Sequence, residues 1–395
     1  MRKIISLLLI GCIFIVTAIT AMAENKDKNG AEYRFYSDAG VTVDEDIDSA
    51  YLIEASTGKV LFAKNEFSSY PPASVTKIMT LLLVCEALDM GMYSLTDMVT
   101  ISANAASMGG SQVFLEEGER ICVEDLIKSA VIASGNDASV ALAELTAGSE
   151  EAFVKKMNQR ADELGLKNTN FENTTGLDDT TVNHFTCAAD IGTMSRELIK
   201  HDFILKYSST WQDSIRNGEF VLTNTNRLVR YYDGCNGLKT GSTDKAGFCI
   251  SATAKRGNMQ LIAVVMGASS SAQRNETART LLDFGFANYA LYEKPEQFVE
   301  EARVKCGTKD YLSLYSTPFI CVVEKSKISS VELFYNIPEV INAPINKGEV
   351  VGSIIYKIDG EQIGKSEIFS LEEIDKIDIY DLFIRIIKRI IIGTK

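Results

Sequence analysis

Three short motifs in a fixed order constrain this chain more than any other feature of its sequence. Ser74-Val-Thr-Lys77 comes first, Ser134-Gly-Asn136 second and Lys239-Thr-Gly241 third. Any one of these patterns can arise by chance. Together they are typical of a serine nucleophile that attacks an acyl group and passes its proton to a lysine. A fold that uses them must bring together three segments that are widely spaced along the chain.

Local context separates the first motif from a second copy of the same pattern. Ser56-Thr-Gly-Lys59 lies at the turn of a hairpin predicted over 51–65, where a serine and a lysine have no fixed relation. Ser74 instead begins an apolar helix predicted from Ala73 to about Met90. Residues at i and i+3 share a helical face, so the amine of Lys77 can reach the Ser74 hydroxyl. The alternative is an N-cap serine beside a surface lysine.

The second motif also has a second copy in the chain, and both the second and the third motif have a purely structural explanation. Ser134-Gly-Asn136 interrupts two predicted helices, 122–133 and 137–147, and such a break can present both side chains to a cleft. Ser102-Ala-Asn104 matches the same pattern, and a helix break with capping residues would explain either copy. Lys239-Thr-Gly241 occurs once, on a predicted strand whose glycine allows the close approach of a ligand or another backbone. Its alternative is a surface turn.

Charge and cysteine content exclude several classes of function. The chain has 395 residues and a formal net charge of −13, whereas binding to nucleic acid requires a basic face. Seven of the eight cysteines lie beyond residue 23, and an odd number at scattered spacings does not form a disulfide framework. With only two histidines and no Cys-x-x-Cys, a zinc site is not expected. The sequence therefore predicts no metal, no cofactor and no nucleic-acid partner.

The N-terminus is typical of an exported protein. A basic start at Arg2-Lys3 is followed by an apolar run and by Ala21-Met-Ala23, which has the form of a cleavage site. These features predict a signal peptide over 1–23; a retained membrane anchor is the alternative. Residues 24–45 are polar and are expected to form a flexible N-terminal segment. We therefore expect the protein to be exported and extracytoplasmic.

Hydrophobic patterning predicts two folded domains. Strands over 238–268 and a helix at about 272–291 would complete an α/β domain that extends over 46–295. Short β-like runs at 311–315, 319–324, 330–335 and 350–358 then alternate with turn residues. They predict a small all-β domain, resembling a sandwich, over 296–370.

The last segment, 371–395, has the pattern of an amphipathic helix. Apolar residues follow a helical period at Ile379, Leu382, Phe383, Ile386, Ile387, Ile390 and Ile391. A helix over 379–392 would be about 21 Å long and is too short and too charged to span a bilayer. It suits a helix that lies in the membrane interface on the outer face of the cytoplasmic membrane. The alternative is a helix packed on the surface of its own protein.

With these motifs the chain resembles the low-molecular-weight penicillin-binding proteins, specifically the serine-type D-alanyl-D-alanine carboxypeptidases of the β-lactamase/transpeptidase superfamily. The resemblance runs from about residue 45 to the end and is strongest at Pro72–Thr80, Ala133–Ala138 and Asn236–Gly247. It implies an α/β (α+β) serine β-lactamase-like transpeptidase domain with a central antiparallel sheet. A small all-β domain and a C-terminal amphipathic helix complete the expected fold.

The resemblance also implies a set of catalytic residues. Ser74 would be the nucleophile and form an acyl-ester with the peptide stem of peptidoglycan, which releases the terminal D-alanine. Lys77 would be the general base, and burial together with a nearby Lys239 would keep its amine partly neutral. Ser134 would relay a proton to the leaving amine, and Asn136 would position the substrate. β-Lactam antibiotics would be covalent inhibitors.

Four further residues are implied to bind the substrate. Lys239 and the hydroxyl of Thr240 would hold its terminal carboxylate, next to Gly241 and Ser242. The backbone N–H groups of Ser74 and Ser242 would form the oxyanion hole. Recognition of a single terminal carboxylate would make the activity exo rather than endo.

Sequence features argue against three rival functions. A class A β-lactamase needs a glutamate four residues before an asparagine, and no glutamate between 144 and 219 has one. A Ser-His-Asp enzyme would need His184 or His201, and neither has a Gly-x-Ser-x-Gly nucleophile elbow nearby. A non-catalytic cell-wall-binding module would not need an intact serine and two lysines. Two positions depart from the family pattern, namely Ser242 and the stretch 173–179, which replaces a Pro-His-Gly sequence.

Overall fold

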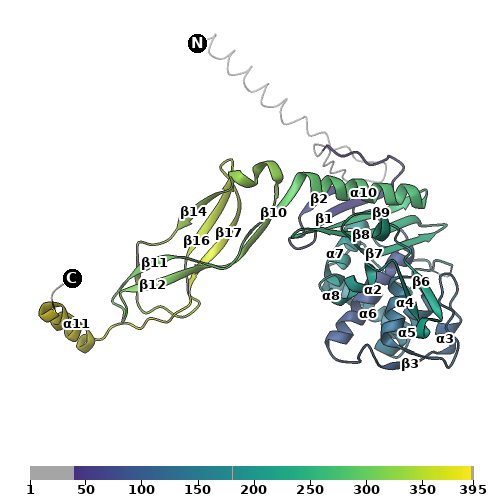
Figure 1. Ribbon diagram of the computed structural model, residues 1–395, viewed down its shortest axis with the longest axis horizontal. Helices are drawn as coiled ribbons and strands as arrows, with labels where there is room; N and C mark the ends of the chain where they lie inside the picture. Colours follow the sequence, from purple (N-terminus) through teal and green to yellow (C-terminus); the bar gives the residue numbers. More distant parts are fainter. Residues whose placement is uncertain (1–39, 180, 393–395) are drawn as a thin grey trace, which may run out of the picture. The chain divides into compact units, whose positions relative to one another are not determined.

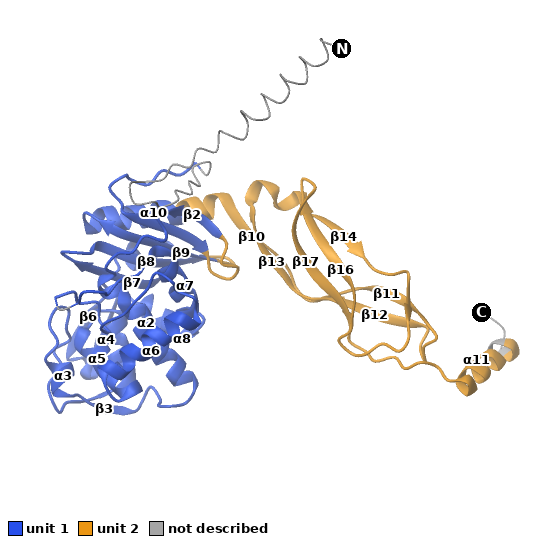
Figure 2. Cartoon of the chain, turned by 180° about the vertical axis from the view of Figure 1, so that it is seen from behind, with its two compact units in different colours: residues 1–53, 60–255, 260–282 blue, residues 54–59, 256–259, 283–395 orange. Residues whose placement is uncertain are grey.

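The computed structural model describes residues 40–179 and 181–392, which form two compact units (Figures 1 and 2). The first unit comprises residues up to 53, 60–255 and 260–282, and the second comprises 54–59, 256–259 and residues from 283 onward. The predicted signal peptide and most of the predicted flexible segment lie outside the described residues. Each unit has its own sheet and its own core, and we describe each separately.

A five-stranded antiparallel sheet organises the first unit. Its order is β2-β1-β9-β8-β7, with bounds β1 Ser49–Glu54, β2 Val60–Lys64, β7 Cys235–Thr243, β8 Gly247–Arg256 and β9 Met259–Ala268. The central strand β9 is apolar along almost its whole length because both of its faces are buried. Among the residues that the structure describes, the edge strand β7 pairs only with β8, from Cys235↔Ala254 to Thr243↔Gly247. Its other edge is therefore open.

Helices cover both faces of this sheet. Helix α10 (Ser271–Asn288) lies on one face, and a cluster of helices lies under the other (Figure 1). That cluster contains the 3₁₀ turn η2 (Ala73–Thr76), α2 (Lys77–Asp89), α4 (Val123–Val131), α5 (Asn136–Ala147), α6 (Glu150–Glu163), α7 (Ala188–Leu198) and α8 (Asp202–Ser208). Most residues of α2 are buried, including the polar Lys77 and Thr80. A helix that is apolar on all sides is typical of a core helix.

Shorter elements complete the first unit. They are α3 (Ala103–Ala106), α9 (Leu228–Tyr231), the ribbon of β3 (Met98–Thr100) and β4 (Arg120–Cys122), and the hairpin of β5 (Gln212–Ile215) and β6 (Phe220–Thr223), closed by the 3₁₀ turn η3 (Arg216–Gly218). The hairpin and the loop that precedes β4 border the site described below.

The second unit is an all-β domain followed by a helix. Its main sheet has the order β14-β16-β17-β12-β11-β15, and β10 (Tyr289–Lys294) pairs with β13 (Phe319–Glu324) in a second sheet. The strands of the main sheet are β11 (Gln297–Lys305), β12 (Tyr311–Ser316), β14 (Glu332–Asn336), β15 (Val340–Asn342), β16 (Val350–Ile358) and β17 (Glu361–Ser370). Tyr356 is fully buried at the centre of the core, where its ring stacks on Phe319 at 3.8 Å.

Two predicted helices differ from the observed ones at their ends. The segment predicted as a helix from Ala73 begins as a 3₁₀ turn, because Val75 N–H bonds to the carbonyl of Pro72 and Ala73 has a left-handed φ of 48°. The helix predicted over about 272–291 ends at Asn288, because Tyr289 and the residues after it pair with β13. Residues 289–291, which were expected to end this helix, therefore form part of a strand instead.

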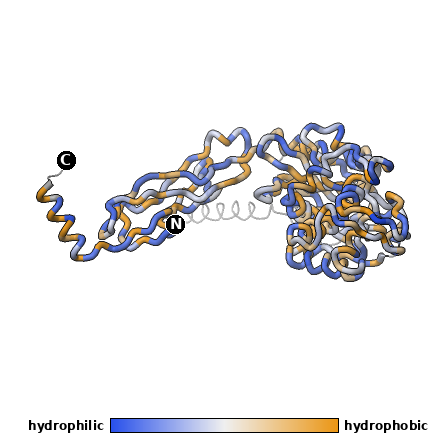
Figure 3. The backbone as a smooth tube through the Cα atoms, turned by 60° about the horizontal axis from the view of Figure 1, so that its bottom comes forward, coloured by the Kyte–Doolittle hydropathy of each residue, from blue (hydrophilic) through white to orange (hydrophobic). Residues whose placement is uncertain are grey.

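The last element is α11 (Ile379–Ile392), whose apolar side chains are exposed. Ile379 and Ile390 are 88% and 76% exposed, and apolar and polar residues alternate along the helix in Figure 3. On its other side Arg385 donates hydrogen bonds to the carbonyl of Gly307 and to Asp310. Among the described residues no helix is both long enough and apolar enough to cross a membrane.

Candidate active site

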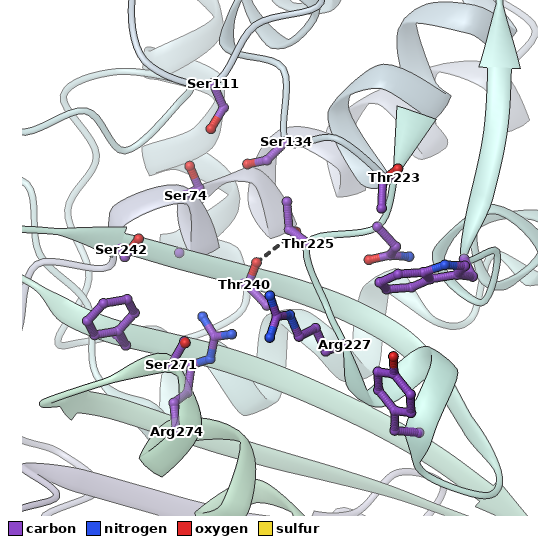
Figure 4. Close-up of a pocket in the computed structure, with 15 residues that line it drawn as sticks. Ser74, Ser111, Ser134, Thr223, Thr225, Arg227, Thr240, Ser242, Ser271 and Arg274 are labelled. Atoms are coloured by element: carbon purple, nitrogen blue, oxygen red, sulfur yellow. Dashed lines mark hydrogen bonds between the residues drawn. The ribbon is translucent and has the colours of Figure 1, made fainter. Parts of the chain in front are cut away.

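The three motifs converge on one cleft in the first unit. Ser74 lies in η2, Ser134 in the break between α4 and α5, and Thr240 on the open edge of β7 (Figure 4). The cleft has a volume of about 750 Å³, and the hydroxyl groups of Ser74, Ser111 and Ser134 lie at one end of it. The predicted convergence of distant segments is therefore present in the fold.

Lys77 is the buried cation beneath the serine. Its side chain is fully buried, and Nζ donates to Ser74 Oγ at 2.9 Å, to Asn136 Oδ1 at 2.6 Å and to the Thr175 carbonyl at 2.9 Å. Burial, with a smaller contribution from the charge of Lys239, holds the pKa of Lys77 well below its ordinary value. An amine with a lowered pKa can accept a proton near neutral pH.

Ser134 and Lys239 form a second hydroxyl–amine pair opposite the first. Ser134 has a left-handed backbone, with φ 64°, at the break between the two helices, and its Oγ accepts a hydrogen bond of 2.9 Å from Lys239 Nζ. Lys239 also donates to the carbonyl of Thr240. Burial, followed by the charge of Arg274, lowers the pKa of Lys239 to about 7. Both pairs therefore join a hydroxyl to an amine that loses its proton more easily than a free lysine does.

Gly241 permits the close approach of β7 to the nucleophile. A Cβ at this position would lie 2.7 Å from the backbone nitrogen of Ser74 and 2.9 Å from that of Val75. Any side chain would therefore push η2 away from the strand. Ser242, the next residue, lines the cleft beside Ser74 (Figure 4).

Lys239 is not among the residues that line the cleft, and its expected contact with the substrate carboxylate stays a prediction. It is 1% exposed and lies behind Ser134, on the same side of β7 as Gly241. Arg227 and Arg274 are the cations that line the cleft, with Thr240 between them and the serines of the first two motifs (Figure 4). Burial lowers the pKa of Arg274 to about 10, a value at which the guanidinium stays charged at neutral pH.

Neither arginine was found from the sequence. Arg227 is separated from β7 along the chain and Arg274 lies in α10, so their proximity depends on the fold. The residues that line the cleft include these two arginines and no aspartate or glutamate. A cleft with this charge distribution favours an anionic group on its ligand.

Ser111 is a third hydroxyl that sequence reasoning missed. It lies on the loop between α3 and β4, and its carbonyl accepts a hydrogen bond from the backbone of Asn136. Asn136 Nδ2 also donates to the Gly109 carbonyl, and the Asp137 carboxylate accepts hydrogen bonds from the backbone N–H groups of Val113 and Leu115. Asn136 of the second motif and the next residue, Asp137, therefore hold this loop against the cleft.

The second copies of the motifs have structural roles. Ser56 Oγ donates to the buried carboxylate of Glu54 in the β1–β2 turn, as expected for a turn serine. Ser102 caps the N-terminus of α3 by accepting a hydrogen bond from the backbone of Ala105. Neither serine lines the cleft.

Neither histidine lines the cleft as a partner of Ser74. The ring of His184 accepts a hydrogen bond at Nδ1 from the backbone of Glu172, and Nε2 lies 2.8 Å from Thr76 Oγ1. Burial lowers the pKa of His184 to about 4, so the ring is neutral and donates from Nε2. His201 pairs with Asp89 at the far end of α2. Across the residues that the structure describes, no cluster of three metal-ligating side chains occurs.

Comparisons with known proteins agree with this geometry. The profile of the D-alanyl-D-alanine carboxypeptidase family matches residues 38–270, and that of the penicillin-binding protein 5 C-terminal domain matches 286–376. The chain is 43% identical to D-alanyl-D-alanine carboxypeptidase DacF of Bacillus subtilis, over 95% of both chains. It is 33% identical to DacA of Escherichia coli over 87% of both chains.

Solved structures show the same similarity. Penicillin-binding protein 5 from Haemophilus influenzae matches 85% of this chain and 100% of its own with a TM-score of 0.75 and 32% identity. The ampicillin-bound form of penicillin-binding protein D2 from Listeria monocytogenes matches 61% of this chain and 98% of its own, with a TM-score of 0.56 and 29% identity. The predicted α/β fold with a central antiparallel sheet and a following all-β domain is therefore confirmed. The chain belongs to the D-alanyl-D-alanine carboxypeptidase family, the serine-type peptidases among the low-molecular-weight penicillin-binding proteins.

Proposed function

We propose that the cleft removes the terminal D-alanine from the pentapeptide stems of peptidoglycan through an acyl-ester on Ser74. One observation carries this proposal: the buried amine of Lys77 lies 2.9 Å from Ser74 Oγ, at one end of a cleft whose other charged groups are cations. The family assignment indicates the substrate, and the geometry indicates a serine nucleophile next to its base.

The reaction proceeds in two steps, acylation of Ser74 and hydrolysis of the ester. Ser74 Oγ attacks the carbonyl carbon of the penultimate residue while its proton passes to Lys77 Nζ. The C–N bond then breaks, and the leaving amine of D-alanine takes a proton through the hydroxyl of Ser134. Water hydrolyses the ester and restores Ser74. Asn136 holds Lys77 from one side and positions the substrate from the other.

The substrate binds along the open edge of β7. Its terminal carboxylate lies against Thr240 and the cleft arginines, while Lys239 acts from behind through Ser134. Gly241 lets the strand approach the nucleophile, and the N–H groups of Ser74 and Ser242 receive the developing oxyanion. Because the cations lie on the leaving-group side, a peptide that ends at this position binds better than one that continues.

β-Lactams enter the same site as covalent inhibitors. A β-lactam presents a carbonyl next to an anionic carboxylate, which matches the serine and the cations of the cleft. The ampicillin-bound neighbour from Listeria monocytogenes supports this part of the proposal. Acylation by a β-lactam would consume Ser74 and leave an ester that water removes slowly.

The protein acts outside the cytoplasmic membrane. We infer that residues 1–23 direct export and that α11 then attaches the mature chain to the outer face of that membrane. The exposed apolar side chains of α11 support this attachment, as does the family's action on the cell wall. Along the chain, the all-β domain lies between the catalytic domain and this helix.

Labelling with a fluorescent penicillin tests the active site directly. Wild-type protein should form a stable covalent adduct and release D-alanine from a pentapeptide, whereas Ser74→Ala should do neither. Ser56→Ala is the matched control, because it lies in the other Ser-x-x-Lys copy and should keep full labelling. Labelling or D-alanine release by Ser74→Ala at the wild-type level would contradict the proposal.

A further inference from the structure

The hydrogen bonds of Lys77 determine where its lone pair can point. As an ammonium, Nζ donates to three acceptors: the Ser74 hydroxyl, Asn136 Oδ1 and the Thr175 carbonyl. A neutral amine keeps only two N–H bonds and one lone pair. The amide oxygen and the carbonyl can only accept, whereas a hydroxyl can also donate. With both acceptors in place, the two N–H bonds are occupied and the lone pair must face Ser74.

Asn136 is fixed in this role by its second contact. Its Nδ2 donates to the Gly109 carbonyl at 2.7 Å, so Oδ1 is the atom that faces Lys77. The other acceptor is a main-chain carbonyl on the segment between α6 and α7. Its position depends on the conformation of residues 173–177, which we call the Lys77 turn.

One side chain organises the Lys77 turn. Asn173 Oδ1 accepts hydrogen bonds from the backbone N–H groups of Gly176 at 2.7 Å and Thr175 at 3.2 Å. Asn173 Nδ2 donates to the Leu177 carbonyl at 2.7 Å. The side chain therefore joins both ends of the turn, which is the common behaviour of asparagine in tight turns.

The turn packs directly on the backbone that carries the nucleophile. Gly176 has φ 82°, and a Cβ there would lie 1.8 Å from the carbonyl oxygen of Ala73. Thr174 is held separately, since its N–H and hydroxyl donate to Glu150 and its carbonyl accepts from Thr80. These contacts fix residue 174, and Asn173 is left to set the direction of the next carbonyl.

We propose that Asn173 is a positioning residue for acylation, which fixes the Thr175 carbonyl on Lys77 so that the amine directs its lone pair at Ser74. This inference rests on the proposed function, in which Lys77 is the base. Asn173 does not touch substrate in this scheme; it acts through the turn.

The charges around Lys77 give the inference a pH signature. Lys239 from β7 and Asp137 from α5 face the amine, and Glu150 and the neutral His184 lie behind the turn. The Thr175 carbonyl stabilises the charged amine more than the neutral one, as any acceptor of an N–H bond does. Loss of the hydrogen bond between Lys77 and the Thr175 carbonyl should lower the pKa of Lys77. The acidic limb of the acylation rate should then move to lower pH.

Asn173→Ala is the direct test. Acylation by a chromogenic penicillin and D-alanine release should both be measured per active site, titrated by the amount of label bound at completion. We expect kcat to fall about 10- to 100-fold, because misdirected reacting groups are costly, with KM nearly unchanged. The acidic limb should move to lower pH. Asn173→Ser, whose hydroxyl can form some of the hydrogen bonds of the turn, should lose less kcat than Asn173→Ala. It replaces the alanine variant in the test if that variant does not fold.

Asn158→Ala is the matched control. Asn158 makes two hydrogen bonds with the backbone of Phe171, so it braces the same segment without reaching the Lys77 turn. It should keep the wild-type kcat and pH profile per active site. Equal losses in the Asn158 and Asn173 variants, or an unchanged kcat and acidic limb in Asn173→Ala and Asn173→Ser, would overturn the inference.

Lys77→Gln separates this inference from the proposal beneath it. If Lys77→Gln acylates at the wild-type rate, Lys77 is not the base, and the positioning role of Asn173 is rejected as well. If Lys77→Gln is inactive while the Asn173 variants match wild type, the proposed function stands and only the positioning role is rejected.

Discussion

Two buried lysines and two cleft arginines give the site an excess of positive charge. Lys77 and Lys239 are both almost completely buried, and burial is the largest cause of the lowered pKa of each. Asp137 is the one carboxylate whose charge opposes the pKa shift of Lys77. Without a closer counter-charge, the amines become bases of moderate strength, which suits proton transfer near neutral pH.

Lys239→Gln should change the pH dependence of acylation in a defined direction. The charge of Lys239 lowers the pKa of Lys77, so its removal should raise that pKa and move the acidic limb to higher pH. Lys239 carries its charge mainly below its own pKa of about 7, so the shift should be seen on the acidic side. The plateau should also fall about 100-fold as Ser134 loses its hydrogen bond.

Rates of acylation by a chromogenic penicillin between pH 5 and 10 measure both effects. Lys245→Gln is the control, since Lys245 lies on the surface and donates to the Asp178 carbonyl. A limb that stays in place, or moves to lower pH, would show that Lys239 does not influence the charge of Lys77.

Sequence reasoning could name the motif residues, because their spacing carries chemical information, but it could not orient them. Successive side chains of a strand point to opposite faces, and the sequence does not say which of Lys239 and Thr240 faces the cleft. In the fold the amine of Lys239 donates to Ser134 Oγ, and arginines from other elements line the cleft beside Thr240. Arg227 and Arg274 belong to no motif, so only tertiary structure could reveal them.

At the level of elements, one arginine joins the two segments that border the cleft. Arg216 lies in the turn between β5 and β6, and its guanidinium donates to the carboxylate of Glu119 and to the carbonyls of Val113 and Phe114. The second segment is the loop that carries Ser111. The hairpin that leads to the Thr223–Thr225 wall of the cleft is thus tied to the loop on the other side.

Arg216→Ala should loosen the Ser111 loop. The lost hydrogen bonds involve a charged donor that is about one-fifth exposed, and each such bond contributes about 1.5–3 kcal/mol. Local opening should therefore increase about tenfold or more. Phe114 is exposed and has a left-handed backbone, so chymotrypsin cleavage after it measures this opening.

The control for this prediction is a surface ion pair on α10. Arg279→Ala removes an exposed contact with Glu276, which is expected to contribute little to stability. Its cleavage rate should match wild type. An Arg216 variant that resists chymotrypsin as well as wild type would show that the clamp is not needed to hold the loop.

Elements with a strong periodic pattern were predicted well, and the elements that were missed lack a clear local pattern. The hairpin over 51–65, the two helices around Ser134 and the strands over 238–268 all occur, because each has clear periodicity and turn residues. Strands β11 and β17 were not predicted, since charged residues on their outer faces obscure the alternation. The early end of α10 reflects pairing with β13, which no local pattern encodes.

At the scale of the whole molecule, charge is distributed unevenly along the chain. The protein has a net charge of −13, yet the sequence of α11 contains Arg385, Lys388 and Arg389 against a single acidic residue, Asp381. Arg385 is engaged with Asp310 and the backbone near it. An acidic body is repelled by an anionic surface, whereas a cationic helix with an apolar face is attracted to one.

Truncation after Asp378 tests whether α11 attaches the protein to membranes. Ile374 and Ile377 are bonded into the all-β domain, so a cut after residue 378 removes the helix and spares the sheet. The full chain should float with vesicles that contain anionic lipid, and the truncated chain should not. Both proteins should keep the same rate of penicillin acylation, because the cleft lies within the first unit.

The lipid and salt dependence separates the two forces that hold the helix. Each basic side chain near an anionic surface contributes about 1 kcal/mol, so the charge of Lys388 should favour anionic over neutral vesicles by about fivefold. High salt should remove this preference while leaving the apolar contribution. Phe383→Glu, on the exposed apolar face, should reduce binding to both kinds of vesicle. If the truncated chain binds vesicles as tightly as the full chain, α11 is not the membrane attachment.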